Sequence, residues 1–157
     1  MVSRLPKLKI SRMAFIATFL LAALSPSAQA VAQSQSPEPS TTFTEAVAAK
    51  LLSQIAEGLQ GHSARKMLDA FDVARMDGGA TFKEQITAFF NQYETIRVHF
   101  KLVEVKDGMA VVDAELDGTP RDSITPPEHK RAQLTFMASQ GAGGWKFIDV
   151  QPRGFFS

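Results

Sequence analysis

The feature that most limits the possible folds of this chain is a single change in the spacing of its apolar residues, near residue 95. Before that point, apolar residues recur every three to four positions, which is the period of an amphipathic α-helix. After it, they alternate with polar residues, which is the period of a half-buried β-strand. Helices followed by strands, with no βαβ units, predict an α+β fold in which helices pack on one face of an antiparallel sheet.

Three helical patterns precede the change in spacing. Gly58 and Gly61 are expected to end the first helix, and Ser63 to cap a second, shorter one. Asp77-Gly78-Gly79 breaks the pattern again, and the third helix is expected to begin at Thr81. The expected apolar stripes are Phe43, Val47, Leu51, Ile55 and Leu59, then Ala64, Met67, Leu68, Phe71 and Ala74, then Phe82, Ile86, Phe89, Phe90 and Tyr93.

Four strands are predicted after the change. Lys106-Asp107-Gly108 is typical of a hairpin turn, because Asp-Gly accepts the positive φ angles that such turns require. The alternation slips by one residue at Leu102-Val103 and again at Val111-Val112, which predicts a bulge or a sharp bend. A proline-containing loop is expected from Asp117 to Glu128. The predicted strands are residues 96–102, Met109–Leu116, Lys130–Ser139 and Trp145–Val150.

The first thirty residues have the order of a secretory signal peptide. A basic stretch, Arg4–Arg12, is followed by the apolar run Met13–Leu24 and by the small residues of Ala28-Gln29-Ala30. We therefore expect cleavage after Ala30, with Ala32 as the alternative, and a mature protein that is periplasmic or secreted.

The competing interpretation of this segment is a membrane anchor that stays attached. Twelve apolar residues rise about 18 Å as a helix, against a hydrocarbon layer of about 30 Å. We therefore expect no stable membrane span after cleavage. Residues 31–42 are polar and interrupted by prolines, which favours a flexible linker, and residues 43–157 are expected to form one domain.

Composition makes several classes of function improbable. The chain has no cysteine, which excludes disulfides, thiolate catalysis and cysteine-ligated zinc. Without its first thirty residues it has 13 basic and 16 acidic residues, a net charge of −3, so nucleic acid is not an expected partner. The three histidines do not have the spacing of a metal motif, and we expect neither a metal nor a cofactor.

The last predicted strand reads Gly144-Trp145-Lys-Phe-Ile-Asp149-Val. With the helices and the long meander before it, this strand resembles the nuclear-transport-factor-two-like superfamily, whose cone-shaped, cystatin-like α+β fold is shared by ketosteroid isomerases, scytalone dehydratase and SnoaL-type polyketide cyclases. The resemblance covers residues 43–157 and implies three N-terminal helices packed on a curved four-stranded antiparallel sheet. No catalytic residue carries over: Tyr93 is the only tyrosine, and His62 and His129 are expected in loops.

One candidate site is a ligand pocket at the mouth of the cone. Phe71, Asp72, Met76, Tyr93 and Trp145 could line it and bind a small hydrophobic ligand. The large side chains among them would equally serve as the core of a domain without disulfides.

The other candidate is a polar sheet face formed by Arg97, His99 and Lys101 on one strand and by Asp113 and Glu115 on its partner. In a catalytic site, His99 would be a base tuned by Asp113. On an ordinary sheet face, opposite charges would pair across strands, each pair contributing roughly 0.2–1 kcal/mol. A homodimer surface is the third interpretation.

These observations favour an exported, non-enzymatic module that binds a small molecule or associates with itself. The alternative is a cofactor-independent isomerase, dehydratase or hydrolase that acts on a small hydrophobic substrate in the cone. Ionisable side chains that converge in the cavity would favour the enzyme, and an apolar lining would favour binding.

Overall fold

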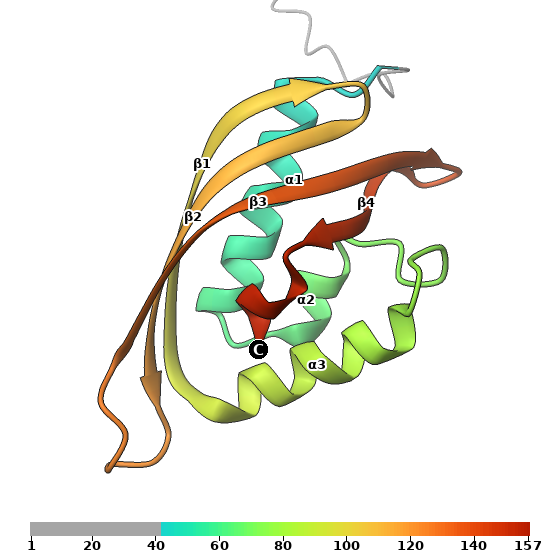
Figure 1. Ribbon diagram of the computed structural model, residues 1–157. Coiled ribbons are helices and arrows are strands. Elements are labelled where there is room, and N and C mark those ends of the chain that lie inside the picture. Colours follow the sequence, from blue (N-terminus) through green and yellow to red (C-terminus); the bar gives the residue numbers. More distant parts are fainter. Residues whose placement is uncertain (1–41) are drawn as a thin grey trace, which may run out of the picture. The chain divides into compact units, whose positions relative to one another are not determined.

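Residues 42–157 are described by the computed structural model of the chain (Figure 1). The α+β order predicted from the sequence is confirmed. The predicted signal peptide and all but the last residue of the predicted linker lie outside the described residues. The elements are α1 (Glu45–Gln60), α2 (Ala64–Leu68), α3 (Gly79–Gln92), β1 (Tyr93–Lys106), β2 (Met109–Pro120), β3 (Glu128–Gly141), β4 (Gly144–Gln151) and the 3₁₀ helix η1 (Arg153–Phe156).

The sheet is an antiparallel meander in the order β1-β2-β3-β4, and the helices and η1 lie on its concave side (Figure 1). The β1–β2 turn is the predicted one, since Asp107 and Gly108 have φ angles of 50° and 79°. The slip predicted at Leu102-Val103 is confirmed, because the pairing of β1 with β2 skips from Leu102 to Glu104. Val103 is the extra residue of this bulge.

The second predicted slip, at Val111-Val112, is wrong. β2 pairs with β3 without interruption from Met109 to Gly118. Burial alternates regularly along β2 through Val111 and Val112. The extra residue that shifts the pairing of β1 with β2 is on β1.

Two helix boundaries differ from the prediction, whereas Gly61 is the C-cap of α1 and Ser63 the N-cap of α2, as expected. α1 continues through Gly58, which is glycine because α2 crosses there: a β-carbon at Gly58 would lie 2.8 Å from Met67 Cβ. α3 begins at Gly79 rather than at Thr81, directly after Gly78, whose φ of 65° is in the left-handed region. Within residues 42–157, none of the helices has the length and hydropathy that a membrane crossing requires.

The two middle strands are longer than predicted. β2 runs to Pro120 and β3 begins at Glu128, so the loop between them spans only residues 121–127. The extension arises at the start of β1, where Tyr93 pairs with Pro120 and keeps the strands together. Tyr93 itself, expected at the end of a helix, is the first residue of β1.

The core lies on the concave side of the sheet. Phe136 and Phe147 face each other there with ring centroids 4.7 Å apart, and Phe71 packs against both. Among the described residues, no polar or charged residue is fully buried. Phe155 and Phe156 are buried as well, so the end of the described chain folds back into the core.

Both outer strands are hydrogen-bonded to the helical segments beside them. Gln60 donates to the carbonyl of Val98 at 3.1 Å, and His62 donates from Nε2 to the carbonyl of Tyr93 at 2.8 Å. On β4, the main chain of Phe147 is bonded to the segment between α2 and α3 at 2.8 and 3.0 Å.

Candidate functional site

The convex face of the sheet carries three rows of polar side chains, which we call the outer sheet face. The middle row, on β2, is acidic, and the rows on β1 and β3 are mostly basic. This pattern follows from antiparallel register, which places alternate residues of neighbouring strands side by side. Across the three strands, the sets are Arg97, Asp117 and His129; His99, Glu115 and Arg131; and Lys101, Asp113 and Gln133.

The contacts of the acidic row run to β3. They are Arg131 Nε to Glu115 Oε1 at 3.0 Å, His129 Nδ1 to Asp117 Oδ1 at 2.6 Å, and Gln133 Nε2 to Asp113 Oδ1 at 3.1 Å. All three pairs are exposed, and exposed pairs of this kind contribute about 0–1 kcal/mol each. This arrangement is that of a solvated sheet face.

The strand register also decides which residues lie next to the histidines. His99 lies opposite Glu115, whereas Asp113, the residue expected to tune it, lies opposite Lys101. His129 is on β3 rather than in the predicted loop, because β3 begins at Glu128. The sheet therefore brings the predicted polar residues together, but not in the expected pairing.

The residues of the predicted ligand pocket do not come together in one pocket. Phe71 and Met76 are buried in the core, and Trp145 packs against Phe43 with a centroid distance of 5.2 Å. The main-chain N–H of Asp72 donates to Phe147 of β4, and Asp72 and Phe71 help to line a depression of about 320 Å³. Tyr93 lies elsewhere, at the start of β1.

A groove separates α1 from the outer edge of β1. It has a volume of about 320 Å³ and is lined mainly by apolar groups and by small side chains of α1. Its lining residues are Ala49, Leu52, Ser53, Ala56, Gln60, Val98, His99, Phe100 and Leu102.

A polar cluster occupies the concave face where β1 begins. The Tyr93 hydroxyl donates a hydrogen bond to Glu128 Oε2 on β3. Lys130 Nζ lies 3.3 Å from Glu128 Oε1 and 6.0 Å from the ring centroids of Phe89 and Tyr93. Glu128 and Lys130 flank the outward-facing His129, which places both on the concave face. We call Phe89, Tyr93, Glu128 and Lys130 the Tyr93 cluster.

The segment from Arg153 to Ser157 lies beside the Tyr93 cluster. Gln85 of α3 donates from Nε2 to the main-chain oxygens of Arg153 at 2.7 Å and of Phe156 at 3.2 Å. Lys130 donates from Nζ to the main-chain oxygen of Ser157 at 2.6 Å. Side chains of α3 and β3 thus hold residues 153–157 through their main-chain oxygens.

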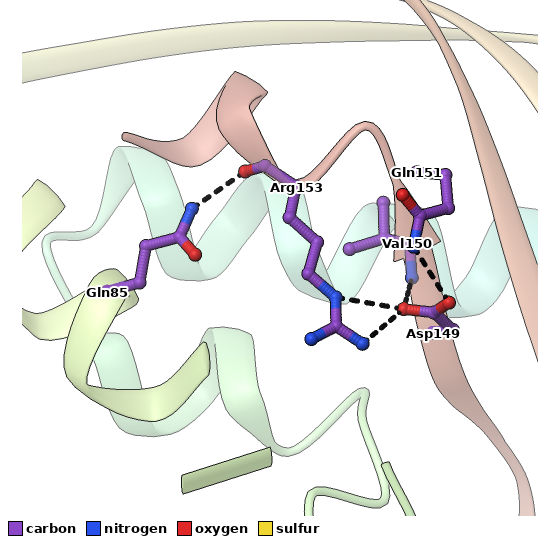
Figure 2. A network of polar contacts seen from close by, with 5 residues as sticks. All are labelled: Gln85, Asp149, Val150, Gln151 and Arg153. Carbon is purple, nitrogen blue, oxygen red and sulfur yellow. Dashed lines mark hydrogen bonds and ion pairs between the residues drawn. The ribbon is translucent and has the colours of Figure 1, made fainter. Parts of the chain in front are cut away.

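An ion pair anchors the beginning of η1 to β4 (Figure 2). Arg153 Nε and Nη2 lie 3.0 and 2.7 Å from Asp149 Oδ1. Asp149 also accepts from the main chain of Val150 at 2.8 Å and from Gln151 Nε2 at 3.0 Å. Burial opposes ionisation of this carboxyl, but these hydrogen bonds and the Arg153 charge outweigh it and lower the pKa of Asp149.

Across residues 42–157, no group of three or more His, Asp or Glu side chains is placed to hold a metal ion.

Three solved structures share this arrangement of helices and sheet. A conserved protein from Planctomyces limnophilus matches 68% of this chain and 91% of its own, with 12% identity and a TM-score of 0.57. A candidate aromatic ring hydroxylase from Novosphingobium aromaticivorans matches 67% and 84%, with 17% identity and a TM-score of 0.51. A candidate calcium/calmodulin-dependent protein kinase II association domain from Xanthomonas campestris matches 73% and 89%, with 12% identity and a TM-score of 0.51.

The chain has the nuclear-transport-factor-two-like fold. At these identities the likeness is one of fold, and the site must be argued from the residues of this chain. No protein-family model and no curated protein matches the sequence.

The protonation states of the Tyr93 cluster in this nuclear-transport-factor-two-like fold follow from burial and from the contacts of its side chains. Burial, followed by the hydrogen bond to Glu128 and its negative charge, raises the pKa of Tyr93 to about 12. The same hydrogen bond and the nearby Lys130 ammonium outweigh burial and lower the pKa of Glu128. At neutral pH the cluster therefore holds a protonated phenol and an ionised carboxylate.

Sequence reasoning placed Tyr93 in a pocket but missed Gln85, Glu128 and Lys130. The sequence pattern places Glu128 in a loop and Lys130 at the start of a strand, and neither position indicates a site. Their role in the nuclear-transport-factor-two-like cone depends on pairing between distant strands, for which the sequence has no local signal. The alternation of Glu128 and Lys130 around His129 was the one available indication that they share a face.

Proposed function

We propose that this chain is an exported, non-enzymatic module of the nuclear-transport-factor-two-like fold that binds a small apolar molecule on the concave side of its sheet. The observation that carries this proposal is the composition of that side. Buried aromatic and aliphatic side chains fill it, and the polar groups of Gln85, Tyr93, Glu128 and Lys130 converge at one end. Apolar walls with few oriented polar groups are typical of small-molecule sites.

The displaced pKa values do not single out a general acid or base. A general acid or base works best with a pKa near the operating pH. Among the described residues, the pKa of Tyr93 is raised, and the pKa values of Asp122, Glu128 and Asp149 are lowered. Each of these shifts moves away from neutrality, so the isomerase, dehydratase or hydrolase alternative gains no support from them. It does gain support from the convergence of Tyr93, Glu128 and Lys130, and it is therefore kept as the alternative.

Export belongs to the proposal on the strength of residues 1–30 alone. Their basic, apolar and small-residue segments follow the order of a cleavable secretory signal. The module would then act in the periplasm or outside the cell.

Fluorescence titration with 1-anilinonaphthalene-8-sulfonate tests the binding function. Trp145, the only tryptophan, would transfer energy to a bound probe. We expect saturable one-to-one binding by a chain whose near-ultraviolet circular dichroism shows intact tertiary packing. Ala56→Phe, which fills the groove between α1 and β1 without adding a second tryptophan, should leave binding unchanged. Loss of binding in this variant would show that the probe binds in that groove instead. If the folded chain shows no saturable binding, the proposal is contradicted.

Self-association through the outer sheet face is a second candidate function, favoured by one observation. Met109 and Met137 lie directly opposite each other on β2 and β3, and are 39% and 43% exposed. Contiguous exposed apolar groups rimmed by polar residues can mark a contact surface, and these two side chains would form its centre. Sedimentation velocity would show a dimer that Met137→Lys dissociates, whereas Ile124→Lys, in an exposed loop, would not. A wild-type chain that stays monomeric contradicts this candidate.

A further inference from the structure

We propose that η1 occupies the ligand site as an internal substitute, and that the ligand which displaces it is a planar aromatic molecule carrying a carboxylate. This inference rests on the proposed function and adds to it the class of ligand and the way access is controlled.

The apolar part of η1 indicates the shape of the ligand. Phe156 is fully buried, and its ring meets Phe89 edge to face, with centroids 6.2 Å apart and an interplanar angle of 87°. Phe155 is 5% exposed and packs at 89° against Phe156, with a centroid distance of 5.2 Å. Aromatic rings favour this geometry, and a ligand ring in place of Phe156 would recover the contact with Phe89.

The polar contacts of η1 indicate the chemistry of the ligand. Gln85 and Lys130 both act as donors, and each donates to main-chain oxygens of the segment. A ligand that replaces the segment must therefore bring acceptors. A carboxylate suits Lys130, because a hydrogen bond between an ammonium and a carboxylate is charge-assisted on both sides.

The anchor of η1 shows how the segment can leave without unfolding the domain. The Arg153–Asp149 ion pair ties its first residue to β4 and lies before the two buried phenylalanines. Residues 154–157 can therefore move away while Arg153 stays bound. An incoming ring would restore part of the apolar burial that Phe155 and Phe156 lose.

Calorimetric titration of the mature chain with 2-naphthoate tests the inference, with 2-naphthalenemethanol as the matched neutral probe. Phe156→Ala removes the competing ring and keeps the main-chain acceptors. Since a closed site weakens apparent affinity by the fraction of open molecules, we expect this variant to bind 2-naphthoate about tenfold more tightly.

Lys130→Met tests the carboxylate. We expect it to weaken 2-naphthoate by about tenfold and to leave 2-naphthalenemethanol unchanged, because only the charged probe uses the ammonium. Lys146→Met is the matched control, since it removes an exposed ammonium that donates instead to the Asp69 carbonyl. Equal weakening in both variants would show a general charge effect and overturn the assignment of a carboxylate.

If Phe156→Ala does not fold, hydrogen exchange of the wild-type chain tests the displacement of η1 instead. Saturating 2-naphthoate should speed amide exchange in residues 154–157, because these residues have left the site. Slower or unchanged exchange there, with 2-naphthoate bound, would contradict displacement while leaving the binding function intact. If neither naphthalene probe nor 1-anilinonaphthalene-8-sulfonate binds the folded chain, the proposed function itself fails.

Discussion

The ring of Tyr93 lies against the main chain of Gly118, so close that a β-carbon on this glycine would overlap it. Gly118 is the register partner of Glu128, to which the Tyr93 hydroxyl donates. One side chain of β1 therefore crosses β2 and reaches β3. The crossing is possible only because the residue beneath the ring has no side chain.

Gly118→Ala should consequently displace the Tyr93 ring. We expect the free energy of unfolding to fall by about 1–3 kcal/mol, as overpacked sites do. A double-mutant cycle with Tyr93→Ala, measured by urea denaturation, isolates the cause. The two losses should be strongly non-additive, because the alanine at position 118 meets no ring in the double variant. Additive losses would show that the strain lies elsewhere.

The single tyrosine makes the environment of this ring directly measurable. Tyrosinate absorbs near 295 nm, so a spectrophotometric titration reports Tyr93 alone. We expect a pKa of about 12 in the folded chain. Glu128→Gln should lower it only part of the way towards 10.0, since burial is the larger cause and the carboxylate the smaller. A wild-type midpoint near 10.0 would contradict the buried hydrogen bond.

The same shift predicts how stability changes at alkaline pH. The unfolded chain releases the tyrosine proton near 10.0 and the folded chain near 12, so between these values only the folded state still holds it. Stability therefore declines as pH rises from about 10 to about 12. Comparing urea unfolding of the wild type with that of Tyr93→Phe checks this: the decline assigned to this group should be absent from the variant.

Gly58→Ala should destabilise the packing of α1 against α2. The added β-carbon would lie 2.8 Å from Met67 Cβ and closer still to its main chain, so a helix must move. We expect a loss of about 1–3 kcal/mol in urea denaturation. Gly143→Ala is the control, because nothing lies within 4 Å of its new methyl group. Similar results for the two variants would contradict the close crossing of the helices.

The two faces of the sheet should respond very differently to truncation. Phe136→Ala, like Phe89→Ala, removes a fully buried ring and should cost about 3–5 kcal/mol. His99→Ala, on the exposed outer sheet face, should change stability by no more than about 0.5 kcal/mol. A large effect at His99 would show that this face is covered or forms a site.

The export proposal is tested by the intact mass of the protein recovered from its native host. Cleavage at either expected position gives a chain that begins at Val31 or at Gln33. A mature species that still contains Met13–Leu24 would contradict a cleavable signal.

The order of helices and strands could be predicted because each depends on local spacing of apolar residues. The inward positions of β1 to β3 follow directly from alternation, as the burial of Ile96, Val112 and Phe136 shows. The ends of the elements were harder to predict. Phe71 was assigned to a helix because it continues an apolar stripe, yet its main chain pairs with Phe147, 76 positions away.

The candidate site was predicted less well than the fold. Tyr93 was recognised as a large side chain near a pocket, but its partner Glu128 is brought to it only by the register of three strands. The position of η1 was harder still to predict, because Phe155-Phe156 suits an exposed contact patch as well as a buried one. Contacts between distant residues decide both cases, and no local pattern encodes them.

The hydrogen bonds at the two edges of the sheet have a consequence for aggregation. Unpaired outer strands invite other chains to add to a sheet and to grow into fibrils. Here Gln60 and His62 take up carbonyls of β1, and the segment after α2 takes up both main-chain groups of Phe147 on β4. These contacts occupy part of each edge, and edge-to-edge growth is therefore hindered on both sides of the sheet.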